Sequence, residues 1–225
     1  MWYTVTITYR EVAHTDILYQ DKRIVVAVKP AGVVSTDVRN GMPELLRRQL
    51  HTDCIRTVHR LDAPVSGLMV LARSSHAAGE LSRQIREGEF RKEYLAVLRG
   101  TPCAPSGELL DLLGRDGTRR VTYVADAPAK GVQEARLRYE TLEKKAGLTL
   151  VRIHLLTGRT HQIRVQFASR GLPLAGDRRY GAADDPVSPI ALWSAHLAFL
   201  HPETGAEMTF DRQPPPIDPW NNFAI

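Results

Sequence analysis

The feature that most constrains the fold of this chain is its series of short apolar or alternating segments, bounded by residues such as Gly, Pro, Asp and Ser. Alternation with a period of two is typical of a half-buried β-strand, and a short unbroken apolar run is typical of a fully buried one. The segments predict strands at residues 17–19, 24–28, 68–72, 93–98, 119–124, 135–139, 148–155, 190–200 and 207–210. Residues 1–10 also alternate and predict a short amino-terminal strand.

Helical periodicity is found in only three stretches, and each has a residue type that begins or ends helices, such as Pro in the first turn or Gly after the last. The helices are predicted at residues 43–50, between Ser74 or Ser75 and Gly88, and, after a turn at 157–160 with a good N-cap, at 161–170. Many strands with three helices favour an α+β fold with a largely antiparallel sheet.

The remaining segments carry no strong periodicity. Residues 101–117 are rich in Pro, Gly and Asp and are predicted to form an excursion at the surface. Residues 212–225 include three consecutive prolines and are predicted to form a stiff, extended tail. No linker is long enough to separate two domains, so residues 1–225 are expected to form a single domain.

Composition excludes several classes of protein. There is no apolar run near 18 residues and no signal peptide pattern, so a cytoplasmic protein without membrane contact is expected. The two cysteines, Cys54 and Cys103, and the eight scattered histidines lack the spacing of metal ligands, so no metal is expected. The net charge of +5 and 24 arginines against 6 lysines suit a polyanionic partner without establishing one.

Sequence motifs for familiar cofactors are missing, because there is no phosphate-binding loop, GxGxxG turn, GxSxG elbow or HExxH helix. The remaining candidates for chemistry are Asp62, Tyr94 and the cluster at residues 158–164. Each has an ordinary structural interpretation when taken alone. An Asp in a loop usually forms a turn, a Tyr in a strand usually packs, and an Arg on a helix is usually solvated.

Taken together and in order, these residues belong to four motifs. The motifs are His59-Arg60-Leu61-Asp62-x-x-x-Ser66-Gly67, Lys92-x-Tyr94-Leu95-Ala96, Gly158-Arg159-Thr160-His161-Gln162-Ile163-Arg164-Val165 and Gly176-Asp177-x-x-Tyr180-Gly181. The series resembles the RluA class of RNA pseudouridine synthases over residues 17–210, nearly the whole chain. The resemblance implies a pseudouridine-synthase-type domain, in which a central RNA-binding cleft splits a mixed, mainly antiparallel sheet.

The same resemblance implies a reaction and its substrate. A uridine in rRNA or tRNA would be isomerised to pseudouridine, with the base detached from C1′, turned and rejoined through C5. Nothing is added or removed, so no cofactor or metal is implied. The target nucleotide would first have to be flipped out of its stack. Whether the base leaves through a glycal or through a covalent adduct stays open.

Residue roles follow from matching positions in the motifs. Asp62 is implied as the catalytic carboxylate, Arg164 as the arginine that pairs with it, and Tyr94 as the residue that stacks on the target base. Arg60 is implied to fill the space left by the flipped nucleotide. The RNA-binding candidates are Arg159, His161, Gln162, Arg178 and Arg179.

The sequence also departs from the family pattern. Val65 replaces a Thr before Ser-Gly, Ser194-Ala195 replaces His-Ala, and residues 132–135 lack a frequent Pro-Ala. The segment before residue 17 is too short for the S4-like domain of many relatives, so the catalytic domain is expected to select the RNA by itself, as a monomer.

Two other functions are compatible with parts of the pattern. A protein that binds or folds RNA without catalysis would keep the basic surface but not the motif residues. A glycosidase-like hydrolase would need a second carboxylate across the bond, and Asp177, the nearest candidate, is interpreted as a structural residue of a Gly-Asp turn.

Overall fold

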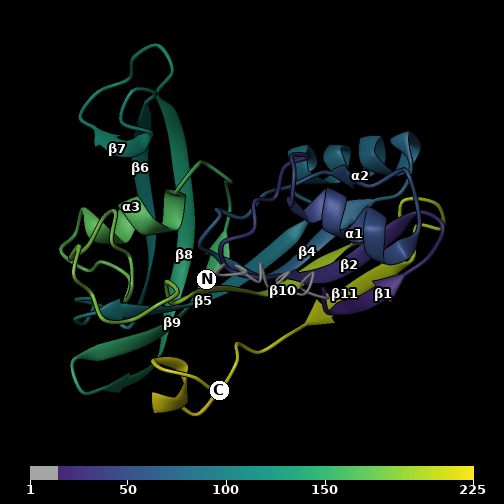
Figure 1. Ribbon diagram of the computed structural model, residues 1–225. Coiled ribbons are helices and arrows are strands. Elements are labelled where there is room, and N and C mark those ends of the chain that lie inside the picture. Colours follow the sequence, from purple (N-terminus) through teal and green to yellow (C-terminus); the bar gives the residue numbers. More distant parts are fainter. Residues whose placement is uncertain (1–14) are drawn as a thin grey trace, which may run out of the picture.

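The computed structural model describes residues 15–225, in which an 11-stranded sheet is accompanied by three α-helices (Figure 1). The strands are β1 (Ile17–Gln20), β2 (Ile24–Lys29), β3 (Arg56–Thr57), β4 (Ser66–Ala72), β5 (Arg91–Arg99), β6 (Ser106–Asp116), β7 (Val121–Ala125), β8 (Gln133–Lys145), β9 (Leu148–Leu155), β10 (Leu192–Leu200) and β11 (Glu207–Asp211). The helices are α1 (Met42–Leu50), α2 (Ser75–Glu87) and α3 (Gln162–Ala168), and Trp220–Asn222 form the short 3-10 helix η1. The predicted α+β class is confirmed. The strand predicted at residues 1–10 lies outside the described residues.

The sheet is mixed but mainly antiparallel, as predicted, with the strand order β1-β2-β4-β10-β5-β9-β8-β6-β7. The pairing of β4 with β10 is parallel, and it joins the half of the sheet that carries α1 and α2 to the half that carries α3 (Figure 1). The register pairs Ser66 with Trp193 and Gly67 with Ser194. Gly67 is required here, because a Cβ on it would lie 2.4 Å from the carbonyl oxygen of Ser194, and its φ is +116°.

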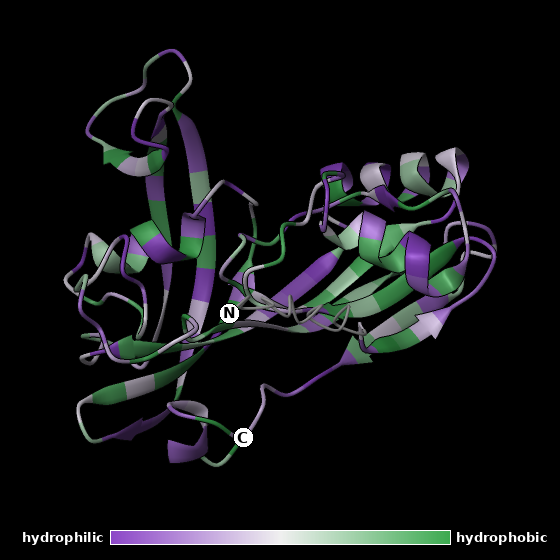
Figure 2. Ribbon diagram, viewed as in Figure 1, coloured by the Kyte–Doolittle hydropathy of each residue, from purple (hydrophilic) through white to green (hydrophobic). Residues whose placement is uncertain are grey.

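Strands β2 and β4 are buried on both faces, which explains why their sequences read as apolar runs. Val25, Met69 and Leu71 pack in one core with Met42 and Leu46 of α1. The alternate residues of both strands pack in a second core with α2; they are Ile24, Val26, Leu68, Val70 and Ala72. Strand β8 instead alternates between apolar and hydrophilic residues along its length (Figure 2).

Helices α1 and α2 begin and end where the sequence predicted. Pro43 lies in the first turn of α1. The Ser74 side chain accepts the Ala77 N–H at the start of α2, and Gly88 ends that helix in the left-handed conformation. No helix within residues 15–225 has the length and apolar character needed to cross a membrane.

The surface excursion predicted at residues 101–117 is wrong, because Ser106–Asp116 form the long strand β6. Its glycines were misinterpreted as turn residues. A Cβ on Gly114 would lie 2.4 Å from the ring of Tyr123 on β7, and one on Gly107 would lie 3.1 Å from the ring of Tyr139 on β8. Both glycines therefore make room for an aromatic ring on the neighbouring strand.

The extended tail predicted at residues 212–225 is only partly correct. Trp220 and Phe223 are buried and pack in a core with Leu95, Val97 and Trp193. The chain therefore folds back onto the sheet after the prolines, because burial of two large aromatic side chains stabilises the fold.

The third predicted helix is shorter than expected. Helix α3 begins at Gln162 and ends at Ala168, and its N-cap is His161 in the left-handed conformation, with no side-chain cap hydrogen bond. The N-cap expected in the turn at residues 157–160 is therefore absent.

Candidate active site

A buried lysine, Lys29, holds the loop that carries Asp62. The Nζ of Lys29 donates hydrogen bonds to the carbonyl oxygens of Pro30 (2.9 Å), Val33 (2.6 Å) and Ala63 (3.0 Å). Burial lowers the pKa of Lys29 to about 8. Gly32 adds a backbone hydrogen bond to the carbonyl oxygen of Ala63 at 2.8 Å. The turn after β2 is therefore tied to the residue that follows Asp62.

Residues 59–62 alternate between the core and the solvent. His59 and Leu61 are buried, whereas Arg60 is exposed and the Asp62 side chain is 23% exposed. His59 Nε2 accepts the N–H of Val70 at 3.1 Å, and burial lowers the pKa of His59 to about 3, so its imidazole is neutral. Ser35 Oγ bonds both the N–H and the carbonyl oxygen of Leu61. Arg60 and Asp62 therefore project to the same side of a fixed loop.

Val65 has a structural explanation. Its side chain is 2% exposed and packs in the core that contains Leu61 and Tyr94. The turn is closed by the Val65 N–H, which donates to the carbonyl oxygen of Asp62 at 3.0 Å. Backbone and lysine contacts hold this loop, so no threonine hydroxyl is needed at this position.

Arg164 connects Asp62 to a second, fully buried carboxylate. Its Nη1 lies 3.1 Å from Asp62 Oδ2, and its Nε and Nη2 each lie 2.8 Å from an oxygen of Asp177. The Arg164 side chain is 5% exposed and that of Asp177 is 0% exposed. Burial opposes the ionisation of Asp177, but the hydrogen bonds and charge of Arg164 outweigh it and lower the pKa of that carboxyl. Arg164 is thus held on one side while one N–H group points at Asp62.

Tyr94 lies at the centre of the sheet, on β5 between β10 and β9. It is 5% exposed, and its burial, followed by the nearby negative charge of Asp62, raises the pKa of its hydroxyl. The phenol therefore stays protonated at neutral pH.

His161 and Tyr180 complete the surroundings of Asp62. His161 Nε2 lies 3.9 Å from Asp62 Oδ2, and His161 Nδ1 lies 2.7 Å from the hydroxyl of Tyr180. The guanidinium carbon of Arg164 lies 5.2 Å from the centroid of the Tyr180 ring. Tyr180 thus contacts both positively polarised groups that face Asp62.

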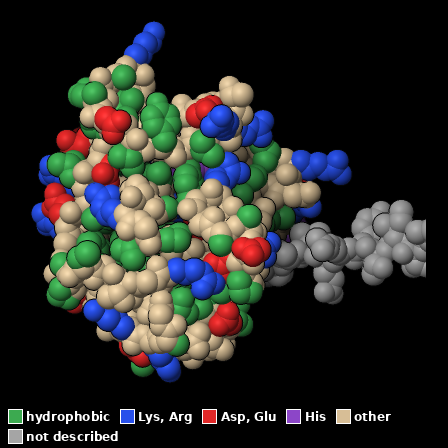
Figure 3. All heavy atoms as spheres, turned by 90° about the vertical axis from the view of Figure 1, so that its left-hand side faces the viewer, with side chains coloured by type: hydrophobic (Ala, Val, Ile, Leu, Met, Phe, Trp, Pro, Cys, Tyr) green, Lys and Arg blue, Asp and Glu red, His purple; other side chains and the backbone are tan. Residues whose placement is uncertain are grey.

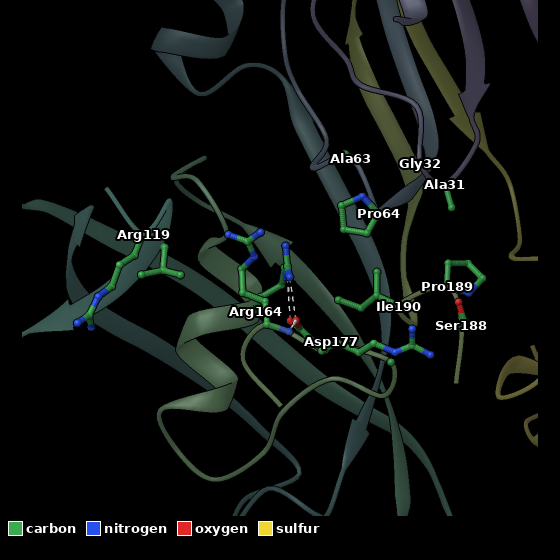
Figure 4. Close-up of a pocket in the computed structure, with 14 residues that line it drawn as sticks. Ala31, Gly32, Ala63, Pro64, Arg119, Arg164, Asp177, Ser188, Pro189 and Ile190 are labelled. Atoms are coloured by element: carbon green, nitrogen blue, oxygen red, sulfur yellow. Dashed lines mark hydrogen bonds and ion pairs between the residues drawn. The ribbon is translucent and has the colours of Figure 1, made fainter. Parts of the chain in front are cut away.

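A cavity of about 880 Å³ lies beside this group of residues (Figure 4). Both halves of the sheet contribute to it, and its lining includes Gly32, Ala63, Pro64, Arg119, Arg164, Asp177, Arg178, Arg179 and Ile190. The lining contains four arginines and one carboxylate, so the cavity favours an anionic ligand. The guanidinium of Arg119 points away from the Arg164–Asp177 pair (Figure 4). On the face shown in Figure 3, acidic and basic side chains are interspersed over the surface.

Comparisons with known proteins give the family of this chain. Residues 23–169 match the RNA pseudouridylate synthase family. The dual-specificity RNA pseudouridine synthase RluA of Escherichia coli (strain K12) is 37% identical over 205 residues, which cover 86% of this chain and 90% of that protein. The chain belongs to the RluA-type RNA pseudouridine synthases. These enzymes isomerise uridine in RNA, so the synthase is an isomerase.

Other relatives agree with this family. YhcT of Bacillus subtilis (strain 168), an uncharacterized RNA pseudouridine synthase, is 32% identical over 222 residues, 92% of this chain and 71% of that protein. The chain spans 66% of a longer Mycoplasma pneumoniae relative, to which it is 29% identical. The human RNA pseudouridylate synthase domain containing 1 has the same fold, with a TM-score of 0.78 at 24% identity over 93% of this chain and 87% of that one.

The synthase brings together most residues that the motifs implied. Arg164 and His161 lie within 4 Å of Asp62, and Tyr94 lies near enough for the charge of Asp62 to help raise its pKa. Arg60 is exposed beside Asp62, and Arg178 and Arg179 line the cavity. Arg159 is exposed, and its Nε donates to the carbonyl oxygen of Glu134 at 2.9 Å.

Gln162 is placed differently from the other RNA-binding candidates. It is 3% exposed, and its side-chain amide bonds Thr157 Oγ1, the N–H of Arg159 and the carbonyl oxygen of Arg136. It therefore holds the turn before α3 and does not face the solvent.

Sequence reasoning missed Lys29 and Tyr180 and interpreted Asp177 as a structural residue only. The Gly-Asp-x-x-Tyr-Gly motif was a signal for Asp177 and Tyr180, and the lysine at the end of the apolar strand β2 was a signal for Lys29. Residues 15–225 contain no group of three or more His, Cys, Asp or Glu side chains placed to hold a metal ion.

Proposed function

We propose that the synthase isomerises uridine in structured rRNA or tRNA, and that Asp62 is its catalytic residue. The observation that carries this proposal is the contact of Arg164 Nη1 with Asp62 Oδ2 at 3.1 Å, from an arginine that Asp177 fixes in place. An arginine so placed orients the carboxylate through a charge-assisted hydrogen bond. Asp62 is partly exposed, and Ala63 and Arg164, which flank it, line the cavity, so a nucleotide bound there would lie beside the carboxylate.

The proposed reaction balances without a cofactor. The bond from C1′ to N1 of the base breaks, the base turns, and a bond from C1′ to C5 forms. The proton on C5 is lost and N1 gains one. In one route the Asp62 carboxylate attacks C1′ as the base leaves, and C5 of the turned base later displaces the resulting ester. In the other route the carboxylate takes the proton from C2′ as the base leaves, and the glycal regains a proton at C2′ when the bond from C1′ to C5 forms. Both routes use the same carboxylate.

The surrounding residues suit a flipped nucleotide. Flipping costs a few kcal/mol, which is lowest in loops and distorted stems. Arg60, exposed beside Asp62, would take the place of the flipped nucleotide in the stack. Tyr94 keeps its proton and is nearly buried, so it would contact the base with its ring at the inner end of the site. Arg159, Arg178 and Arg179 would bind phosphates. The synthase would act as a cytoplasmic monomer without cofactor.

The test uses RNA labelled with tritium at C5 of uridine. The wild-type protein should release label from rRNA or tRNA taken from a strain that lacks the gene. Asp62→Asn should lower release by roughly a thousandfold or more, since a neutral amide can neither attack C1′ nor accept a proton as a carboxylate does. Asp53→Asn, at an exposed position nearby in the chain, is the matched control and should leave the rate unchanged.

Two results would contradict this proposal in different ways. If the wild-type protein releases no label from any of these RNAs but still binds them, the RNA-binding alternative without catalysis is correct. If Asp62→Asn releases label as fast as the wild type, the activity stands and the assignment of Asp62 is wrong.

A further inference from the structure

The His161 imidazole and the Tyr180 hydroxyl form a pair beside Asp62 to which the proposed reaction gives no role. Tyr180 Oη lies 2.7 Å from His161 Nδ1, and it also accepts the backbone N–H of Thr122 on β7 at 2.8 Å. The opposite nitrogen of the same imidazole, Nε2, faces Asp62 Oδ2 at 3.9 Å. A row of polar groups therefore runs from β7 to the proposed catalytic carboxylate.

The direction of the protons along this row follows from the donors and acceptors available. A backbone N–H can only donate, so the Thr122 contact occupies a lone pair of the Tyr180 oxygen. The hydroxyl proton of Tyr180 is then free to be donated to His161 Nδ1, 2.7 Å away, and in that arrangement Nδ1 is the acceptor. In a neutral imidazole the other nitrogen carries the hydrogen. In this arrangement Nε2 is a donor, and it faces Asp62 Oδ2.

The backbone holds His161 in this orientation. Its backbone φ is +55°, in the left-handed region that residues other than Gly rarely adopt. Such a conformation costs free energy and persists where surrounding contacts fix it. Thr122 Oγ1 donates to the carbonyl oxygen of Thr160 at 2.9 Å, so β7 holds the residue before His161 as well as its partner Tyr180. The His161 side chain is only 15% exposed.

We propose that Tyr180 holds His161 in the neutral Nε2–H tautomer, so that His161 is a positioning residue that gives Asp62 a second, uncharged donor. This inference rests on the proposed role of Asp62. Arg164 already bonds Asp62 Oδ2 directly, and the 3.9 Å gap of His161 would close to a hydrogen bond when bound RNA displaces water from the site. Such a donor orients the carboxylate without adding a positive charge that would weaken it as a nucleophile.

The charges around His161 are consistent with a neutral ring. Burial lowers the pKa of His161, the carboxylates of Asp62 and Asp177 raise it, and the guanidinium groups of Arg164 and Arg179 lower it. The net result is a pKa below the usual value for histidine, so the ring is uncharged at pH 7. Protonation at lower pH would put a hydrogen on Nδ1 and reverse the contact with Tyr180.

The tautomer can be observed without any activity, by nitrogen-15 NMR of the imidazole groups. In the wild type at pH 7.5, His161 should show a protonated Nε2 and an unprotonated Nδ1. Tyr180→Phe removes the hydroxyl and keeps the ring against Arg164, so it should give a mixture of both tautomers. Tyr123→Phe, on the exposed face of the same strand β7, is the matched control and should leave the His161 signals unchanged.

The effect on the reaction is measured by single-turnover rates. Tyr180→Phe and His161→Leu should lower the rate by roughly tenfold to a hundredfold, as for loss of one oriented donor, with RNA affinity unchanged within about twofold. His161→Gln keeps an amide donor and should recover most of the rate. We expect the wild-type rate to fall as pH falls through the pKa of His161, and His161→Gln should remove this loss, which a merely structural role would not produce.

Several outcomes would overturn this inference while leaving the role of Asp62 intact. They are a wild-type His161 protonated on Nδ1, a Tyr180→Phe protein with an unchanged tautomer, and a normal rate in folded Tyr180→Phe or His161→Leu. An inactive wild type would instead count against the proposed function, and the NMR result would still report on the tautomer.

Discussion

Arg164 is the residue on which the geometry of the proposed site depends, because one guanidinium binds two carboxylates in different directions. Nε and Nη2 bind Asp177, and Nη1 is left for Asp62. A planar fork with fixed N–H directions can do this, whereas a lysine ammonium is a single point charge. Removing one partner of a buried ion pair leaves an uncompensated charge, at a cost of about 3–5 kcal/mol.

Arg164→Lys keeps the positive charge, but we expect the lysine to be unable to bind Asp177 and orient Asp62 at the same time. We expect a loss of about 2–4 kcal/mol in the free energy of unfolding and a rate of tritium release lowered by roughly a hundredfold or more. Unfolding in urea and the release assay measure the two effects. The matched control is Arg170→Lys, because Arg170 also forms a two-bonded pair, with Asp111, but is 35% exposed. It should cost about 1 kcal/mol or less and leave the rate unchanged. Full activity of Arg164→Lys would contradict the role given to the fork.

The resemblance of the ordered motifs to a known family was enough to imply that Asp62 pairs with Arg164, about a hundred residues later. It could not show that Arg164 is buried, because its position on a short helix with an irregular start is compatible with a solvated face. The role of Asp177 depends on the distance between two segments that only the folded chain brings together. Gln162 shows the reverse error, since a polar residue within a functional motif was taken for a ligand contact although its amide is used inside the protein.

At the scale of elements, the parallel contact between β4 and β10 joins the Asp62 loop to the rest of the sheet. Gly67 follows that loop directly, and its Cα faces the backbone of Ser194 so closely that a side chain has no room. Ser194 is fully buried next to Tyr94 on β5. The departure from His to Ser at residue 194 therefore lies at a close approach of two backbones beside the site.

Gly67→Ala should force these two strands apart. The added Cβ would meet backbone atoms of Ser194 at 2.4 and 2.5 Å, and φ is +116°, so we expect a loss of about 3 kcal/mol or more in the free energy of unfolding. The control is Gly79→Ala in α2, where a Cβ meets nothing within 4 Å. It should stabilise the helix by about 0.5–1 kcal/mol. Urea unfolding of both variants tests this, and a loss below about 1 kcal/mol for Gly67→Ala would contradict the close-packing explanation.

Elements with a strong local signal could be predicted from the sequence, and those that depend on a distant partner could not. Helix α2 has its own cap residues, Ser74 and Gly88, and was located to within a residue. Strand β6 was missed because Gly107 and Gly114 look like turn residues unless the tyrosines opposite them are known. The folding back of the tail was missed for the same reason, since the residues against which Trp220 packs are far from it in the sequence.

At the scale of the whole molecule, the cavity depends on how the two halves of the sheet are joined. Gly32, Ala63 and Pro64 line it from one half, and Arg164 lines it from the other. Arg178 and Arg179 lie in the segment between α3 and β10, and their guanidinium groups bond carbonyl oxygens, those of Asp185 and Arg120 respectively. Carbonyl oxygens do not neutralise a positive charge. Both arginines therefore keep charge available for phosphates.

These two charges should appear in the salt dependence of RNA binding. Each phosphate contact that releases a counterion contributes about 0.7 to 0.9 to the slope of log affinity against log salt concentration. We expect Arg178→Ala with Arg179→Ala to reduce the magnitude of that slope by about 1.4 to 1.8. Affinity should be measured by fluorescence anisotropy over a range of potassium chloride concentrations, in an Asp62→Asn background that prevents turnover.

The control for this measurement is Arg91→Ala, because Arg91 is 68% exposed but pairs with Glu207 on β11, outside the lining of the cavity. Its removal takes away an arginine whose charge a carboxylate already balances, so the slope should be unchanged. If Arg91→Ala changes the slope as much as the double variant does, RNA is attracted by the net charge of +5 spread over the whole surface. If only the double variant changes it, the phosphates are bound at the cavity, beside Asp62.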